Sequence, residues 1–354
     1  MKILDRYILQ SVLALTGMAG IALLAIYSFV LFMLDVDETG QGGFGYRTLL
    51  MYTLLQMPAA LYLLMPIIAM LGTLLGLGAL ASQSELTAMR AVGFSVARIG
   101  GSTLIAGAVL AVLVLVLGDW AGPAAQQRAE SLRTEAKTGI KAGIGGKAVW
   151  LREGDNVFHI RQLIAEDHIG ATEIFTLGPD LQLTAATSVR EARYRDGAWV
   201  FSGVQRTEFG AASASASATD EIQWNGTLDP DVLRLFVLEA KALSLRGLSR
   251  LISYLDENRL DTSSYKLAFW RKIVAPFTVM AMMLIAVPFV FGALRSAGAG
   301  QRLLVGVMAG LVFYILNEVT ANAGQIYAWS PLFSAAAPTV VVFVLALWRL
   351  RRVT

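Results

Sequence analysis

The run SVLALTGMAGIALLAIYSFVLFML, residues 11–34, decides the fold class of this chain. It contains no charged side chain, and an α-helix needs about 20 apolar residues to cross a bilayer. The run is also longer than the core of a cleavable signal peptide, which has about 7–15 apolar residues. We therefore interpret it as an uncleaved membrane-spanning helix.

Five further segments have the same character, in a chain that is 56% hydrophobic and only 16% charged. Soluble domains have about 25% charged residues. Pro58 and Pro66 interrupt the second apolar region, so we predict a separate surface helix at 48–57 ahead of that span. The six predicted spans are residues 11–34, 59–81, 99–118, 273–294, 303–323 and 331–347.

The distribution of Lys and Arg predicts the orientation, because cytoplasmic loops carry the excess of these residues. Three cations at the predicted outer end of the fourth span oppose this bias: Lys266, Arg271 and Lys272. The balance still favours both termini in the cytoplasm. The short outside loops carry only Arg47. The residues that favour a cytoplasmic location of the termini are Lys2, Arg6, Arg90, Arg98, Arg295, Arg302, Arg349, Arg351 and Arg352.

Spans three and four are separated by residues 119–270, a segment long enough to fold as a domain of its own. We expect helical parts at 1–118 and 271–354, with an extracytoplasmic domain between them. Short apolar stretches with turns between them predict an all-β sandwich or jelly roll in this domain. The predicted strands are 157–164, 173–177, 181–189, 192–195, 198–204 and 221–224.

Three further patterns predict details of the middle domain. Asp196-Gly197, between two strand-like runs, predicts a tight hairpin. Residues 211–219 alternate Ala and Ser, which fits either a strand of small residues or a flexible loop. Residues 244–258 carry apolar side chains at helical spacing and predict an amphipathic helix.

The loop between spans two and three contains the sequence SQSELTAMRAVGF, residues 82–94. Ser82 and Glu85 have the spacing of a capping box, and Gly93 can take the left-handed conformation that ends a helix. We expect a helix at about 83–92, with Leu86 and Met89 on one apolar face. So short a helix is marginal alone, so it docks either on another protein or on the membrane surface.

The residue inventory argues against an enzyme. The chain has no cysteine and two histidines, which excludes disulfides and thiolate chemistry and leaves little for a metal site or a catalytic triad. The predicted spans have no Asp, His or Lys near their centres, where proton carriers and intramembrane proteases need such groups. We expect no catalytic residue, metal or cofactor in this chain, and no nucleic-acid partner for a net charge of only +3.

Two groups of charges near the predicted membrane borders have alternative interpretations. Arg128 and Arg133 follow the third span, where they bind a lipid phosphate or act as ordinary interfacial anchors. Glu318 lies near the outer end of the fifth span, and we interpret it as a solvated helix end.

Several motifs occur together along nearly the whole chain. They are Leu4-Asp5-Arg6-Tyr7-Ile8, Gly76-Leu77-Gly78, Ser84-Glu85-Leu86, Gly93-Phe94, Trp120 with Pro123, Phe291-Gly292 with Leu294-Arg295-Ser296, and Phe313-Tyr314. In this order and spacing they resemble the lipopolysaccharide-export permeases, the LptF/LptG family, and specifically the LptG type.

The resemblance implies a permease subunit of an ATP-driven extractor in the inner membrane of a Gram-negative bacterium. It would move lipopolysaccharide from the outer leaflet of that membrane toward a periplasmic bridge, with residues 119–270 as a periplasmic jelly roll. The implied partners are an LptF-type second permease, two LptB-type cytoplasmic ATPases that bind ATP and Mg²⁺, a single-span LptC-type subunit and an LptA-type bridge protein.

The resemblance also implies site residues. The loop helix matches the family's coupling helix, which implies ATPase contacts for Ser84, Glu85, Leu86, Met89, Arg90, Gly93 and Phe94. The expected lipid contacts are Arg128, Arg133, Phe29, Phe32 and Phe313, and in the β-domain Phe158, Ile160 and Phe201.

One departure concerns the outer end of span one, where similar proteins carry lysines. This chain has Asp35, Asp37 and Glu38 there. Either divalent cations bridge these acids to phosphate, or the headgroup is different.

A membrane-anchored receptor or assembly scaffold, whose β-domain binds a periplasmic partner, is the alternative function. An open apolar inner face of the β-domain would favour the extractor. A solid, closed β-core would favour the scaffold.

Overall fold

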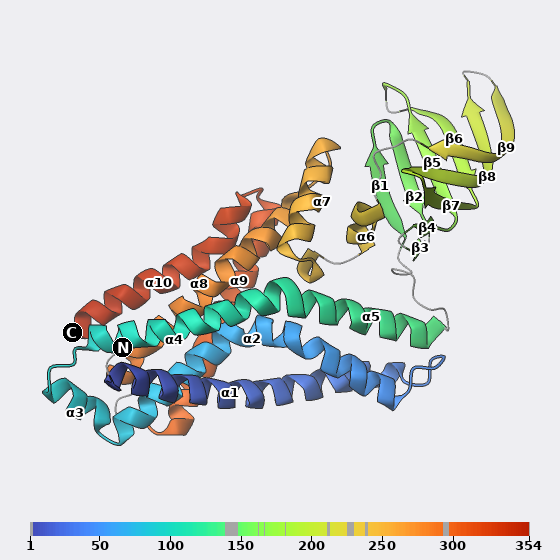
Figure 1. The fold of residues 1–354 in the computed structure, drawn as a ribbon. Helices are drawn as coiled ribbons and strands as arrows, with labels where there is room; N and C mark the ends of the chain where they lie inside the picture. The colour runs from blue at the N-terminus through green and yellow to red at the C-terminus, as the bar shows by residue number, and fades with distance from the viewer. Residues whose placement is uncertain are drawn as a thin grey trace. The chain divides into compact units, whose positions relative to one another are not determined.

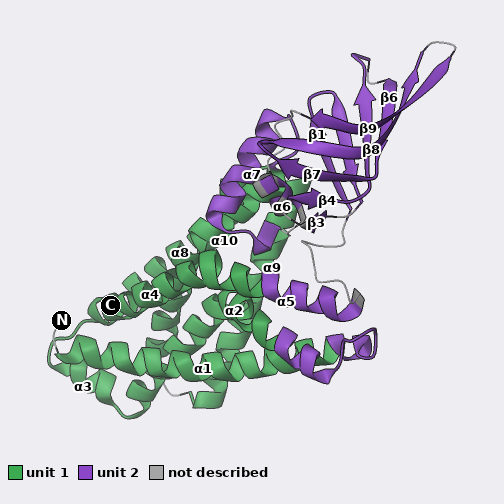
Figure 2. Cartoon of the chain, turned by 45° about the vertical axis from the view of Figure 1, so that its right-hand side comes forward, with its two compact units in different colours: residues 1–34, 53–126, 263–354 green, residues 35–52, 127–262 purple. Residues whose placement is uncertain are grey.

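Two compact units make up the computed structural model (Figures 1 and 2). Residues 1–34, 53–126 and 263–354 form a helical unit, and residues 35–52 and 127–262 form a second unit that contains the β-sheet. The structure describes residues 3–138, 148–161, 163–165, 167–180, 182–210, 213–224, 230–237, 240–292 and 297–353. Parts of the predicted elements at 162, 181, 211–212 and 293–294 lie outside the described residues.

Six of the described helices are long and apolar enough to cross a membrane, as the sequence predicts. They are α1 (Ile3–Asp35), α2 (Tyr46–Ser82), α4 (Val96–Val116), α8 (Ser263–Phe291), α9 (Ala299–Ile326) and α10 (Pro331–Val353). The third span continues through a π-helical turn, Leu117–Ala121, into α5 (Gly122–Thr138), a helix that the sequence analysis did not predict.

The prediction of a separate surface helix at 48–57 is wrong, because α2 runs unbroken through Pro58 and Pro66. Each proline removes one backbone hydrogen bond, which would break a helix in water. In a bilayer the helix is the state that satisfies the remaining backbone groups, so an internal proline is tolerated.

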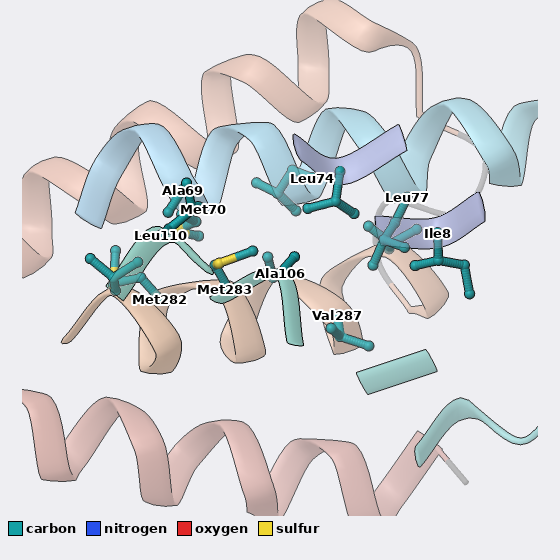
Figure 3. Packing of buried hydrophobic residues seen from close by; sticks show 14 of the residues in the cluster. Ile8, Ala69, Met70, Leu74, Leu77, Ala106, Leu110, Met282, Met283 and Val287 are labelled. Atoms are coloured by element: carbon teal, nitrogen blue, oxygen red, sulfur yellow. The ribbon is translucent and has the colours of Figure 1, made fainter. Parts of the chain in front are cut away.

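The core of the helical unit lies where α2, α4 and α8 meet. Figure 3 shows Leu74 of α2, Ala106 of α4 and Met283 of α8 in this buried cluster. Helix α1 packs closely on α2, where a Cβ at Gly76 would lie 2.9 Å from the Cα of Val12. Small residues at such crossings allow close van der Waals packing, which drives helix association in lipid.

The second unit contains nine antiparallel strands in the order β1-β2-β5-β6-β8-β7-β4-β3, with β9 on the other edge of β8. This half-barrel, similar to a jelly roll, confirms the predicted all-β insertion. The strands are β1 (Val149–Glu153), β2 (Asn156–Ile160), β3 (Leu163–Ala165), β4 (His168–Ile169), β5 (Thr172–Leu177), β6 (Leu183–Val189), β7 (Glu191–Arg195), β8 (Ala198–Phe209) and β9 (Ala214–Trp224).

The predicted hairpin at Asp196-Gly197 is confirmed. Both residues have positive φ, +50° and +84°, and Arg195 pairs with Ala198 across the turn. Strands β6 and β7 pair with successive parts of β8 in one continuous register. The sheet forks between them, because β6 also pairs with β5 whereas β7 pairs with β4.

Other elements of the second unit differ in part from the prediction. The Ala/Ser tract belongs to strand β9, and the run predicted as one strand at 157–164 divides into β2 and β3. The amphipathic helix is α7 (Leu245–Glu257), which Ser244 caps by accepting a hydrogen bond from the Gly247 amide at 3.1 Å. Strand β1, helix α6 (Pro230–Val237) and the short turns Val36–Glu38 and Ala240–Ala242 were not predicted.

Candidate coupling and lipid-contact sites

The loop helix after the second span is α3 (Glu85–Ala91), shorter than predicted. It ends as expected, because Gly93 has a φ of +86° and the Phe94 amide donates to the carbonyl of Met89 at 3.0 Å. The predicted capping box is wrong. Ser82 is still part of α2, and its hydroxyl donates to the carbonyl of Ala79 at 2.8 Å instead of capping α3.

The two faces of α3 have opposite environments. Leu86 and Met89 are only 2% and 6% exposed and belong to the core of the helical unit, together with Phe94. The expectation that Leu86 and Met89 face a partner is therefore wrong, because this short loop folds back onto its own bundle. The exposed face carries Thr87, Ala88, Arg90, Ala91 and Val92, of which Val92 is 78% exposed.

An ion pair and cation–π contacts hold the α3 region to α1 and to the end of α8. Arg98 lies 4.4 Å over the ring of Phe94 and pairs with Asp5 at 3.5 Å. Arg90 lies 5.9 Å over the ring of Phe291. Asp5 and Phe291 belong to motifs that are far apart in the sequence, and the fold brings both to this loop. Figures 1 and 2 show α3 near both chain termini, at one end of the helical unit.

Glu85, the first residue of α3, is partly buried beside α1. Its carboxylate interacts with the hydroxyl of Tyr7. Its Oε2 atom is buried and has no hydrogen-bond partner among the described residues. An unsatisfied carboxylate oxygen is costly to bury.

The predicted lipid contact Arg133 lies in a cluster of charges between α5 and the end of α1. Its guanidinium contacts Glu38, lies 3.7 Å from Asp35 and donates to the hydroxyl of Tyr52 at 2.9 Å. Lys137, one turn further along α5, lies 2.7 Å from the other oxygen of Glu38. Arg128, by contrast, is exposed.

This cluster gives a role to two of the acids that depart from the family resemblance. Asp35 and Glu38 neutralise cations of the chain's own α5 helix. Within the described ranges, no group of three or more His, Asp or Glu residues is placed to hold a metal ion. Lys137 is not among the predicted site residues, because it lies in the last turn of α5, a helix that was not predicted.

The three expected lipid contacts in the β-domain, Phe158, Ile160 and Phe201, are buried. The missed residue Trp224, at the end of β9, stacks on Phe201 at 5.8 Å and meets Phe158 edge-on at 5.5 Å. Its indole N–H donates to Glu153 of β1 at 3.2 Å, across the inner face. The β-domain itself therefore covers these three side chains, and their contact with lipid stays a prediction.

A shallow pocket of about 360 Å³ lies further along the sheet, at the ends of β6, β8 and β9. Its lining is mostly polar and includes the ion pair of Arg206 and Glu208, with a separation of 3.0 Å. This pocket does not offer the apolar route that the extractor hypothesis expects.

The aromatic residues predicted along the spans have three different environments. Phe29 is exposed on α1 and Phe32 is half-buried. Phe313 is buried in the core of the helical unit, so its assignment as a cavity-facing lipid contact is not supported. An apolar residue in a span does not reveal from its type alone whether lipid or another helix covers it.

The cations at the outer end of α8 have partners within the helical unit. Arg271 pairs with Glu318 at 3.0 Å, so the interpretation of Glu318 as a solvated helix end is wrong. Lys272 is buried and donates to the carbonyl of Gly118 in the π-helical turn. These contacts show that Arg271 and Lys272 have structural roles at a position where they oppose the predicted charge bias.

The fold defines a multi-span membrane protein that carries an all-β domain between its third and fourth spanning helices. The family described as "Lipopolysaccharide export system permease LptF/LptG" matches residues 6–352. The chain belongs to this family.

Two kinds of relatives in the family resemble the chain to different degrees. It is 30% identical to LptG of Escherichia coli strain K12 over 353 residues, 99% of this chain and 98% of the relative. It is also 30% identical to LptG of Haemophilus influenzae over 351 residues. Its identity to LptF of E. coli strain K12 is 24% over 278 residues, 77% of this chain and 74% of the relative.

Proposed function

We propose that the chain is the LptG-type permease subunit of a lipopolysaccharide extractor driven by a separate ATPase. The match to LptG relatives over the full length, in a chain with the expected spans and β insertion, carries this proposal. Moving a lipid from a membrane toward water costs about 0.8 kcal/mol for each exposed CH₂. Extraction therefore needs both an energy source and a sheltered route beyond the membrane.

The coupling role of α3 rests on its two faces. The exposed face, with Val92 as its most exposed apolar residue, docks on the ATPase. The opposite face, Leu86 and Met89, packs into the same core as α2 and α8. A movement imposed on α3 is therefore transmitted to the spanning helices through close packing.

The proposed orientation in the membrane rests on the end of the helical unit that contains α3. Both termini lie near α3 (Figures 1 and 2), and the arginines that predict the cytoplasmic side include residues of α3 and of both chain ends. If α3 binds a cytoplasmic ATPase, the termini are cytoplasmic and the β-domain between the third and fourth spans is periplasmic. Membership of the lipopolysaccharide export family supports a location in the inner membrane of a Gram-negative cell.

The partners follow from the family. The similarity to both LptG and LptF relatives supports a pairing with a second, LptF-type permease of the same fold. Two LptB-type ATPases supply the bound ATP and Mg²⁺, and LptC- and LptA-type proteins receive the lipid. Arg128 and Arg133 contact the headgroup, and Phe158, Ile160 and Phe201 contact acyl chains once Trp224 moves away.

Reconstitution tests this function directly. The full-length chain, purified with its co-expressed partners, is placed in proteoliposomes with lipopolysaccharide, and transfer to an LptA-type protein is measured with and without ATP. ATP-dependent transfer supports the extractor. Stable binding of the periplasmic partner without any ATP-dependent transfer would instead support the scaffold function, which the filled β-core favours.

A further inference from the structure

We propose that Glu38 is an internal competitor at the cations of α5, which lowers the affinity of this site for lipids whose headgroups carry phosphate. This inference rests on the proposed function, because it concerns the headgroup of the transported lipid. It assigns to Glu38 the role of an internal competitor for the anion site. A lipid has to displace this carboxylate before Arg133 and Lys137 can bind its headgroup.

The geometry of Glu38 carries the proposal. One of its oxygens contacts Arg133 and the other lies 2.7 Å from Lys137, so the two cations share one carboxylate. Asp35 adds a weaker contact to Arg133 at 3.7 Å. The side chains of these four residues are 18–27% exposed, so they are partly desolvated and still within reach of a headgroup.

The two cations are held in place by contacts that do not involve Glu38. Arg133 also donates to Tyr52 and lies 5.2 Å over its ring. Lys137 lies 5.6 Å over the ring of Phe44, which is fully buried. The backbone joins the same elements, because the Gly43 amide donates to the carbonyl of Ala136 at 2.6 Å. The site is therefore preorganised, and rotation of the Glu38 side chain is enough to open it.

The chemistry of the donors defines the ligand. Arg and Lys bind carboxylate and phosphate oxygens with the same N–H groups. A phosphate monoester carries close to two negative charges at neutral pH, whereas a carboxylate carries one. Replacing the carboxylate by the phosphate therefore places more negative charge beside the two cations. A zwitterionic or uncharged headgroup offers no such gain, and Glu38 keeps its partners.

The test compares Glu38→Gln with Asp37→Asn in the full-length chain in lipid nanodiscs. Asp37 is exposed and adjacent, so its substitution changes the net charge equally while leaving the Glu38 contacts intact. The probes are lipid A with two phosphates and the same lipid with both removed. We expect Glu38→Gln to bind the phosphorylated lipid about fivefold more tightly than the wild type, as fits a partly exposed ion pair. Neither variant should change the affinity for the dephosphorylated lipid.

The other outcomes each overturn a stated claim. An equal gain in Asp37→Asn would show that net charge, and not the contacts of Glu38, sets the affinity. If Glu38→Gln weakened the binding of both lipids equally, Glu38 would only stabilise the local structure. Wild-type protein that binds neither lipid would refute the proposed function and this inference with it. Inorganic phosphate that displaces the lipid at equal concentration would overturn the assignment to a lipid headgroup.

A second variant keeps the inference testable if Glu38→Gln does not fold. Asp35→Asn removes only the weaker contact to Arg133. It should raise the affinity for phosphorylated lipid A by about twofold and leave the dephosphorylated lipid unaffected. No change in affinity for the phosphorylated lipid would overturn the inference.

Discussion

The substitutions Leu86→Ala and Val92→Asp separate the two faces of α3. Leu86 is 2% exposed within the core of the helical unit, so its truncation leaves a cavity. Substitutions of buried leucine by alanine cost about 2–5 kcal/mol. We therefore expect Leu86→Ala to lower the thermal stability of the chain itself, before any partner is considered.

Val92→Asp acts on the opposite face. Because Val92 is 78% exposed, the change should alter the stability of the free chain by no more than about 0.5 kcal/mol. A valine that becomes buried on docking contributes about 1.5 kcal/mol, and a charge in its place adds a desolvation cost. The affinity for the ATPase should therefore fall by more than about tenfold.

Two measurements on the same preparations distinguish the faces: the melting temperature of the purified full-length chain, and the amount of ATPase that co-purifies with it. Gln83→Asp is the matched control, because it places the same charge at an exposed position just before α3. We expect a lowered melting temperature for Leu86→Ala, and for Val92→Asp a normal melting temperature with lost ATPase. Wild-type recovery of the ATPase by Val92→Asp would refute the docking face. An unchanged melting temperature for Leu86→Ala would refute the burial argument.

Three further predictions concern the second unit. The chain has no cysteine, so Ser213→Cys provides a single label; an impermeant thiol reagent should modify it in intact spheroplasts, and labelling only after lysis would contradict a periplasmic β-domain. Trp224→Ala should open the interior of the half-barrel. A photo-crosslinker at Phe201 should then capture lipid without ATP, and capture equal to that with Trp224 intact would show that the indole does not close the interior. The hydrogen bond from His159, and then Arg161, lowers the pKa of Glu173 below its ordinary value of 4.5. Because the folded-state pKa is the lower one, its stabilisation is complete above about pH 4.5 and is lost as the pH falls further. The acid sensitivity of Trp fluorescence should therefore be smaller in Glu173→Gln; an equal sensitivity would exclude Glu173 as its source.

Local chemistry explains what the sequence alone determined. The six spans can be predicted from length and composition alone, because about 20 consecutive apolar residues are what a helix needs to cross a bilayer. The Asp196-Gly197 turn and the Gly93 helix end also depend on residues within one or two turns of the chain. Each of these features is therefore set by residues that are close together in the sequence.

The faces and partners of the same residues were decided only by the tertiary structure. Leu86 and Met89 have the pattern of a docking face, but packing against the bundle buries them. Arg133 and Glu38 are 95 residues apart, and Trp224 and Glu153 are 71 apart. Their contacts depend on how helices and strands pack after they form. A residue's type defines which contacts it can make, whereas the arrangement of distant segments determines which contact it does make.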